Sequence, residues 1–145
     1  MKLINYEVPR LADLLFNLPL KGKESRMRTR LVLQLDEYIK NTLQREEYAL
    51  ILEYGMKDEA DEPMIDEDSG GYILVQETAQ EYHKEHNAIQ NEDYYIEENG
   101  QNKEMLLSVA ESVINCDLAL TGEMATLWDK WCGQFEGVIQ RYDNI

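Results

Sequence analysis

Apolar side chains recur at helical spacing through most of this chain. In the longest run, Met27, Leu31 and Leu35 lie four residues apart, and further apolar residues continue the same face. This pattern predicts an amphipathic helix over about residues 26–54, because one stripe of an α-helix repeats every three to four residues. Gly55 follows the last of these positions and is expected to end the helix.

The start of this helix carries a second pattern. Ser25 stands where an N-cap is expected, which favours a helix. Arg26, Arg28 and Arg30 alternate with less polar residues, however, and an alternation of period two is typical of a β-strand. The sequence favours the helix and leaves the strand open as an alternative.

The N-terminal part predicts a short strand or arm and then a short helix. Residues 3–8 alternate between apolar and polar types, as a strand does. Pro9 suits the first turn of a helix that continues to Leu18. Pro19 and Gly22 are expected to interrupt that helix before the long one begins.

Residues 55–76 differ from the helical parts of the chain. Two acidic stretches and the pair Gly70–Gly71 supply turn residues, and residues 72–75 are rich in β-branched and aromatic types. This segment predicts a small acidic β-hairpin between two helices.

The remainder of the chain returns to helical spacing. Thr78 is expected to cap a third helix, and residues 105–118 and 124–142 predict a fourth and a fifth helix that pack together. A connector over residues 94–96 predicts one more short strand. Three aromatic residues of the last helix are expected in the core: Trp128, Trp131 and Phe135.

These elements predict a mostly α fold, a single α+β domain of about five helices with a small acidic β-hairpin insertion. The length of 145 residues and the 43% of hydrophobic residues suit one core. Residues 1–54 form a basic N-terminal part with the long helix, residues 55–76 the acidic hairpin, and residues 77–145 the remaining helices.

The charge balance narrows the choice of partner. The chain has 29 acidic and 14 basic residues and a net charge of −15 at pH 7. Nucleic acid and anionic membranes repel such a protein, so we expect no direct binding to either. No apolar run reaches membrane-spanning length, and a cytoplasmic location is expected.

The charge is also unevenly distributed. Residues 1–30 carry a net charge of +4, whereas residues 53–98 contain fifteen carboxylates and two lysines. Burial of unpaired carboxylates is costly, so these groups must face solvent or a cationic partner. One interpretation is a solubilising face, and the other is a surface spaced like a phosphate backbone. The candidate partner-binding residues are Asp58, Glu59, Asp61, Glu62, Asp66, Glu67, Asp68, Glu77, Glu81 and Glu85.

A basic cluster lies at the start of the long helix. Its members are Lys21, Lys23, Arg26, Arg28 and Arg30. A helix start with such charges can bind phosphate, but pairing with the protein's own acidic segment or with another copy is favoured.

Residues 66–77 come close to a calcium-binding EF-hand loop. Asp66, Asp68 and Glu77 stand at loop positions one, three and twelve. Position five is Gly70, which offers no side-chain oxygen, and no second loop is present to pair with it. A calcium site is therefore the weaker interpretation, and a glycine-containing hairpin turn is the stronger one.

No pattern in the sequence indicates catalysis. His83 and His86 form neither a zinc motif nor a di-iron motif and are expected at the surface. Cys116 and Cys132 lack a neighbouring base or further ligands and are expected to be buried free thiols. We therefore expect no enzymatic activity, no metal and no cofactor.

The run LPLKGKESRMRTRL, residues 18–31, resembles the hydrophobic-Lys-Gly-Lys-x-Ser-Arg-x-Arg stretch of a family of small uncharacterised proteins. Tailed phages and prophages of Gram-positive bacteria encode that family. The resemblance extends through the long helix, the acidic hairpin and the third helix. It implies a gene near the tail and lysis modules, where virion parts and accessory proteins that blunt host defence are both encoded, and it assigns no catalytic residues.

These observations lead to one favoured function and two alternatives. The favoured one is a phage accessory protein in the host cytoplasm that binds and inhibits a basic host protein. A nucleic-acid-binding defence nuclease is one such target, as for an anti-CRISPR protein, and the acidic surface would mimic nucleic acid. The first alternative is a self-associating structural or assembly component of the phage tail or virion. The second is a calcium-dependent binding module.

Overall fold

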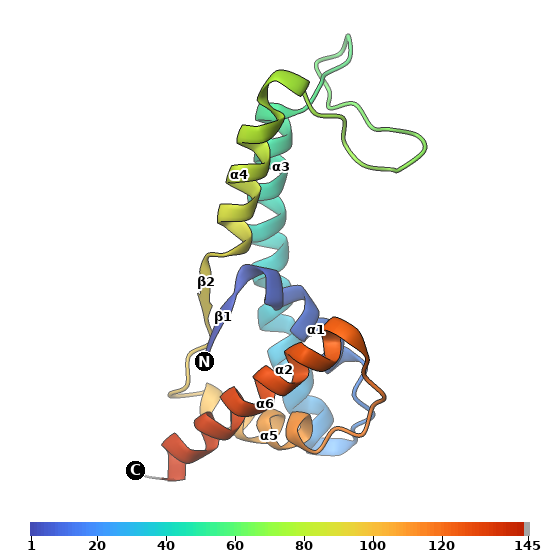
Figure 1. Ribbon diagram of the computed structural model, residues 1–145. Coiled ribbons are helices and arrows are strands. Elements are labelled where there is room, and N and C mark those ends of the chain that lie inside the picture. The colour runs from blue at the N-terminus through green and yellow to red at the C-terminus, as the bar shows by residue number, and fades with distance from the viewer. Residues whose placement is uncertain (144–145) are drawn as a thin grey trace. The chain divides into compact units, whose positions relative to one another are not determined.

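Residues 1–143 are described by the computed structural model, and they are mostly helical with a two-stranded antiparallel sheet. This confirms the predicted fold class. Figure 1 draws the described residues, which divide into two units. Residues 1–37 and 93–143 form the first unit, and residues 38–92 form the second. One domain over residues 1–145 stays a prediction.

The sheet of the first unit joins two segments that lie far apart in the sequence. Strand β1 (Lys2–Ile4) pairs antiparallel with strand β2 (Asp93–Tyr95), and Leu3 lies opposite Tyr94. Both strands were expected from the sequence, although their pairing was not. A 3-10 turn, η1 (Asn5–Glu7), leads from β1 into helix α1 (Val8–Phe16), which has proline in its first turn as predicted.

Three longer helices complete the first unit. They are α2 (Gly22–Tyr38), α5 (Asn102–Ile114) and α6 (Gly122–Asp143). Helices α5 and α6 pack against each other, as predicted. The core consists of apolar residues with 2% exposure or less, among them Leu11, Leu15, Met27, Leu31, Leu35, Met105, Leu106, Val109, Val113, Trp131, Phe135 and Val138.

The aromatic residues of α6 differ in burial. Trp131 and Phe135 are fully buried, which confirms their expected place in the core. Trp128 is only half-buried, and its indole N–H donates a hydrogen bond of 2.9 Å to the backbone oxygen of Val113. Because it is only half-buried, Trp128 lies at the edge of the core. The hydrogen bond provides the partner that an indole N–H needs when it leaves water.

The start of α2 differs from the prediction. The helix begins at Gly22, whose φ of +59° is readily adopted by glycine. Ser25 lies inside the helix and is not its N-cap. The alternative strand over Arg26 to Arg30 is wrong, because these residues belong to a helix that buries Met27 and Leu31 on one side.

Between α2 and the next helix, the backbone forms a wider turn. The π-helical segment η2 (Ile39–Leu43) is followed by α3 (Gln44–Tyr54), and the Gln44 N–H donates to the Ile39 oxygen. The long helix predicted for residues 26–54 therefore consists of three helical segments. The apolar residues of this stretch lie four residues apart, whereas one α-helical turn contains 3.6 residues. A π turn contains more residues than an α turn, so it brings the apolar residues back to the same face of the helix.

The second unit contains two packed helices. Helix α3 ends at Tyr54, directly before Gly55 as predicted, and packs against α4 (Ala79–Gln90), as Figure 1 shows. A loop over residues 55–75 and a 3-10 turn, η3 (Gln76–Thr78), connect them. Thr78 precedes α4, but its side chain makes no capping bond to the helix and donates to the Val75 oxygen instead. Its predicted capping role is therefore wrong.

One buried carboxylate links η1 to α6. Glu7 is 2% exposed, and its Oε1 accepts a hydrogen bond of 3.2 Å from the Trp131 indole and lies 3.0 Å from Lys130 Nζ. Its Oε2 accepts the backbone N–H of Ile4 at 2.9 Å. Because both oxygens are used, the carboxylate joins the N-terminal segment to the C-terminal helix.

We predict that Glu7→Ala lowers the free energy of unfolding of the first unit by about 1–3 kcal/mol, because it leaves the buried Trp131 indole N–H without its partner. Urea unfolding followed by tryptophan fluorescence measures this directly, since both tryptophans lie in α6. Glu111→Ala, at an exposed position of α5, is the control. Equal stabilities of the two variants would contradict the role given to Glu7.

A second prediction concerns Arg28, which closes the end of α1. Its Nη1 donates to the backbone oxygens of Leu15 at 2.7 Å and Leu18 at 2.8 Å. The second nitrogen, Nη2, donates to Ser25 Oγ at 3.3 Å. Arg28→Lys keeps the charge but replaces two donor nitrogens by one, so we expect the melting temperature to fall by about 2–8 °C. Arg26→Lys, at an exposed position of the same helix, is expected to change it by less than about 2 °C. A harmless Arg28→Lys would rule out this contact as a stabilising one.

Candidate protein-binding surface

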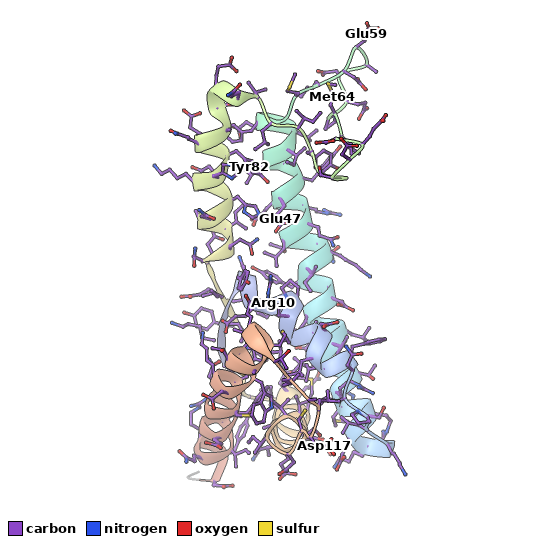
Figure 2. All side chains as sticks on the ribbon, turned by 45° about the vertical axis from the view of Figure 1, so that its right-hand side comes forward. Arg10, Glu47, Glu59, Met64, Tyr82 and Asp117 are labelled. Carbon is purple, nitrogen blue, oxygen red and sulfur yellow. The ribbon has the colours of Figure 1, made fainter. Side chains whose placement is uncertain are left out.

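The loop of the second unit is built from two successive turns. In the first, Lys57 and Pro63 form an isolated antiparallel bridge, and Asp58 Oδ1 accepts the backbone N–H groups of Ala60 at 2.8 Å and Glu62 at 3.0 Å. Figure 2 labels Glu59 at the tip of this turn. One aspartate thus stabilises the backbone of this turn, and the other carboxylates of the turn are exposed.

The second turn repeats this plan. An isolated bridge joins Ile65 to Tyr72, and Asp66 Oδ1 accepts the backbone N–H of Asp68 at 2.9 Å. Gly70 has a φ of +73°, and its N–H donates to the backbone oxygen of Asp66 at 2.8 Å. This conformation requires little energy only because the residue is glycine.

The predicted acidic hairpin is therefore present only in part. The segment contains antiparallel bridges, but none of its residues belongs to a continuous strand, including the predicted strand over residues 72–75. The physical reason lies in Asp58 and Asp66, whose side chains satisfy loop N–H groups locally and so compete with a regular strand ladder.

All ten candidate partner-binding carboxylates lie in the second unit, and all ten are exposed. Seven belong to the two turns, whereas Glu77, Glu81 and Glu85 follow one another at four-residue spacing along η3 and α4. None of the ten forms an ion pair within residues 1–143. The sequence thus located the exposed acidic groups correctly.

The second unit as a whole is strongly negative. Residues 38–92 include 14 acidic and 4 basic side chains, a net charge of −10. The effect reaches Tyr54, whose phenol pKa is raised first by partial burial and then by the charges of Glu53, Glu85 and Glu81. A neighbouring positive charge would meet several carboxylates on this unit at once.

Sequence reasoning missed a groove in the same unit. The groove has a volume of about 280 Å³ and is lined by Gln44, Glu47, Tyr48, Ile51, Tyr72, Tyr82 and His86. These residues come from α3, α4 and the loop, so only the folded unit brings them together. Three of the seven are tyrosines, whose polar hydroxyls and apolar rings suit a protein interface.

Ring contacts organise this groove. Tyr48 and Tyr72 have ring centroids 6.3 Å apart, and Tyr82 stacks on His86 at 5.7 Å with an interplanar angle of 22°. Tyr82 also meets Tyr54 edge to face at 6.3 Å. The aromatic side chains therefore hold one another in place before any partner arrives.

A carboxylate completes the groove. Glu47 is half-buried, and its Oε1 accepts a hydrogen bond of 2.8 Å from the Gln90 side chain, which links α3 to α4. Burial raises the pKa of Tyr82, and the negative charge of Glu47 raises it further. Figure 2 labels both Glu47 and Tyr82 on these two helices. The groove thus combines tyrosine rings with one fixed negative charge.

One sequence signal could have indicated this groove. Tyr48 and Leu52 lie four residues apart on α3 and are both 42% exposed, whereas Leu50 and Ile51 are buried. A second apolar pair outside the buried stripe indicates an exposed contact surface. No sequence signal indicates that Tyr72 lines the groove, because its position depends on how the loop folds back onto the helices.

The predicted calcium alternative is not supported by the arrangement of its residues. Asp66 and Asp68 belong to the second loop turn, and Glu77 belongs to η3. No group of three or more His, Cys, Asp or Glu side chains placed to hold a metal ion occurs in the described part of the chain. Asp66 Oδ1 already accepts the N–H of Asp68, which explains the turn without an ion.

The two histidines and two cysteines considered in the sequence differ in their exposure. His83 is exposed as predicted, while His86 is partly covered by its stacking on Tyr82. Cys116 and Cys132 are both free and half-buried, not fully buried as expected. Burial and the nearby acidic groups raise the pKa of the Cys132 thiol to about 11, so it is a poor nucleophile at neutral pH.

The basic cluster lies at the start of α2 in the first unit. Arg28 is bound to backbone oxygens at the end of α1, and Lys23 Nζ lies 2.5 Å from Glu104 Oε1. The hydrogen bond from Lys23 is the main reason why the pKa of Glu104 is lowered. Arg26, Arg30 and Lys21 are exposed. Arg30 Nη1 also contacts Met27 Sδ at 3.8 Å, so three of the five cations have partners within their own unit.

Comparisons with known proteins find no match to the chain among protein-family models, curated proteins or solved structures. The resemblance to a phage family therefore stays a prediction. None of the helices in residues 1–143 is both long enough and apolar enough to cross a membrane.

The loop geometry predicts that calcium has no specific effect. We expect millimolar calcium to change the melting temperature by less than about 1 °C, because a ligand stabilises only a protein that binds it. Thermal unfolding in calcium, in magnesium and in a chelator checks this. A saturable stabilisation by calcium that Asp68→Asn abolishes would restore the calcium-dependent interpretation.

Proposed function

We propose that this protein is a non-enzymatic binding protein whose acidic second unit attaches to a cationic surface of a partner protein. The observation that carries the proposal is the set of ten exposed carboxylates on one unit, none of them ion-paired within residues 1–143. Complementary charge accelerates association and selects among partners.

The chemistry favours a partner that ordinarily binds nucleic acid. Such proteins carry grooves lined with Lys and Arg, which attract any dense array of negative charge. The two loop turns present seven carboxylates over residues 58–68. When these carboxylates occupy the nucleic-acid-binding groove of the partner, nucleic acid can no longer enter it. Binding of this protein and inhibition of the partner are then the same event.

The resemblance to the phage family extends this proposal to a biological setting. On that basis, the protein is an accessory protein of a phage that acts in the host cytoplasm and inhibits a basic host protein, with a nucleic-acid-binding defence nuclease as the leading class of target. This step rests on the resemblance of residues 18–31, and the binding proposal stands without it.

Self-association in a phage tail or virion is the alternative. It requires the basic cluster of one copy to meet the acidic surface of another. Arg28, Lys23 and Arg30 have contacts within the first unit, which leaves two of the five cluster cations for such a contact and favours a separate cationic partner. Light scattering distinguishes the two, since a defined oligomer or filament supports the alternative.

We predict that neutralising the first turn weakens partner binding. The variant carries Asp58→Asn, Glu59→Gln, Asp61→Asn and Glu62→Gln. Affinity capture of a partner from host lysate, followed by calorimetry on the purified pair, is expected to show a loss of at least about tenfold. For the unchanged protein, affinity should also fall steeply between about 0.05 M and 0.3 M salt.

The matched control removes four exposed carboxylates from the first unit by Glu24→Gln, Glu111→Gln, Asp117→Asn and Asp129→Asn. This variant has the same net charge as the test variant and is expected to retain most of the affinity. Equal losses in both variants would mean that net charge alone matters. Salt-independent binding to the captured partner would contradict the proposal.

A further inference from the structure

The tyrosine groove, defined by Glu47, Tyr48, Tyr72 and Tyr82, is the most specific feature of the acidic unit. We propose that it receives an arginine side chain of the cationic partner. This inference rests on the proposed function and deepens it, because it names the side chain that the partner must offer.

The size of the groove supports a side chain as the occupant. Its volume of about 280 Å³ lies just below the roughly 300–1,000 Å³ of ordinary small-molecule sites. The groove is also open, since Tyr48 is 42% exposed and Tyr72 is 43% exposed. An open site of this size can hold one long side chain that enters from a neighbouring protein.

The lining of the groove selects a cation. Glu47 contributes a negative charge, and the unit around it has a net charge of −10. An anionic side chain is repelled there, and an apolar one would remove water from Glu47 without replacing its hydrogen bonds. The bond from Gln90 uses one acceptor position of Glu47, and a carboxylate has about four, so further donors can bind.

Arginine fits this lining better than lysine. A guanidinium group is planar, stacks on aromatic rings and can donate two parallel hydrogen bonds to a carboxylate. Lysine is a compact and strongly hydrated charge that lacks this shape. Tyr48, Tyr72 and Tyr82 provide the rings and Glu47 provides the carboxylate.

The surface next to the groove is suited to the rest of a partner segment. Leu52 is 42% exposed and lies one helical turn beyond Tyr48. Ile65 is 56% exposed and is bridged to Tyr72 across the second turn. Arginine and aromatic side chains with apolar neighbours are enriched at interface centres, and the rim around such a centre is polar.

The test compares two short blocked peptides, one of alternating arginine and glycine and one of alternating lysine and glycine. We expect the arginine peptide to bind about five- to tenfold more tightly at about 0.05 M salt, because only arginine gains from stacking and the double hydrogen bond. Nuclear magnetic resonance should show the largest shift changes at Glu47, Tyr48, Tyr72 and Tyr82.

Two variants locate the effect. Glu47→Gln retains the acceptor for Gln90 and removes the charge, so the preference for arginine should fall to less than about twofold. Tyr48→Ala removes an exposed ring and should have a similar effect. Glu46→Gln removes the exposed carboxylate of the preceding residue, which does not line the groove, and should leave the preference unchanged.

The outcomes separate this inference from the proposed function. Equal affinities of the two peptides, or a preference unchanged by Glu47→Gln and Tyr48→Ala, would overturn the arginine site and leave the acidic attraction in place. If neither peptide binds at low salt, both the arginine site and the proposed function are wrong.

Discussion

Like charges are concentrated in the second unit and repel one another. Residues 38–92 carry a net charge of −10, and the carboxylates of their two loop turns form no ion pairs within residues 1–143. A chain gains no stability from such an arrangement, because each added charge raises the electrostatic free energy of the folded state. The proposed binding to a cationic partner rests on this uncompensated charge.

The charged groups of the first unit are arranged differently. Glu7 is buried against Trp131 and Lys130, Arg28 closes the end of a helix, and Lys23 pairs with Glu104. Charges in that unit are used to join its own elements. In the proposed binding role of the second unit, the tyrosine groove adds shape to the attraction of charge.

The sequence was sufficient for features that depend on neighbours along the chain. It located the helices, the end of α3 at Tyr54, the core places of Trp131 and Phe135, and the exposure of the acidic residues. It failed where side chains compete with backbone pairing: Asp58 and Asp66 replace a regular hairpin by two turns. It also missed the groove, because its seven residues come from three separate segments and carry no motif.

The most direct test of uncompensated charge is the stability of the protein as a function of ionic strength. Unfolding is followed by circular dichroism in urea at salt concentrations between about 0.01 M and 0.5 M, where screening shortens the Debye length from about 30 Å to a few ångströms. We expect added sodium chloride to raise the free energy of unfolding, since it weakens repulsion among unpaired carboxylates. A decrease with salt would mean that attractive ion pairs dominate the fold, and it would rule out a net repulsion among the carboxylates.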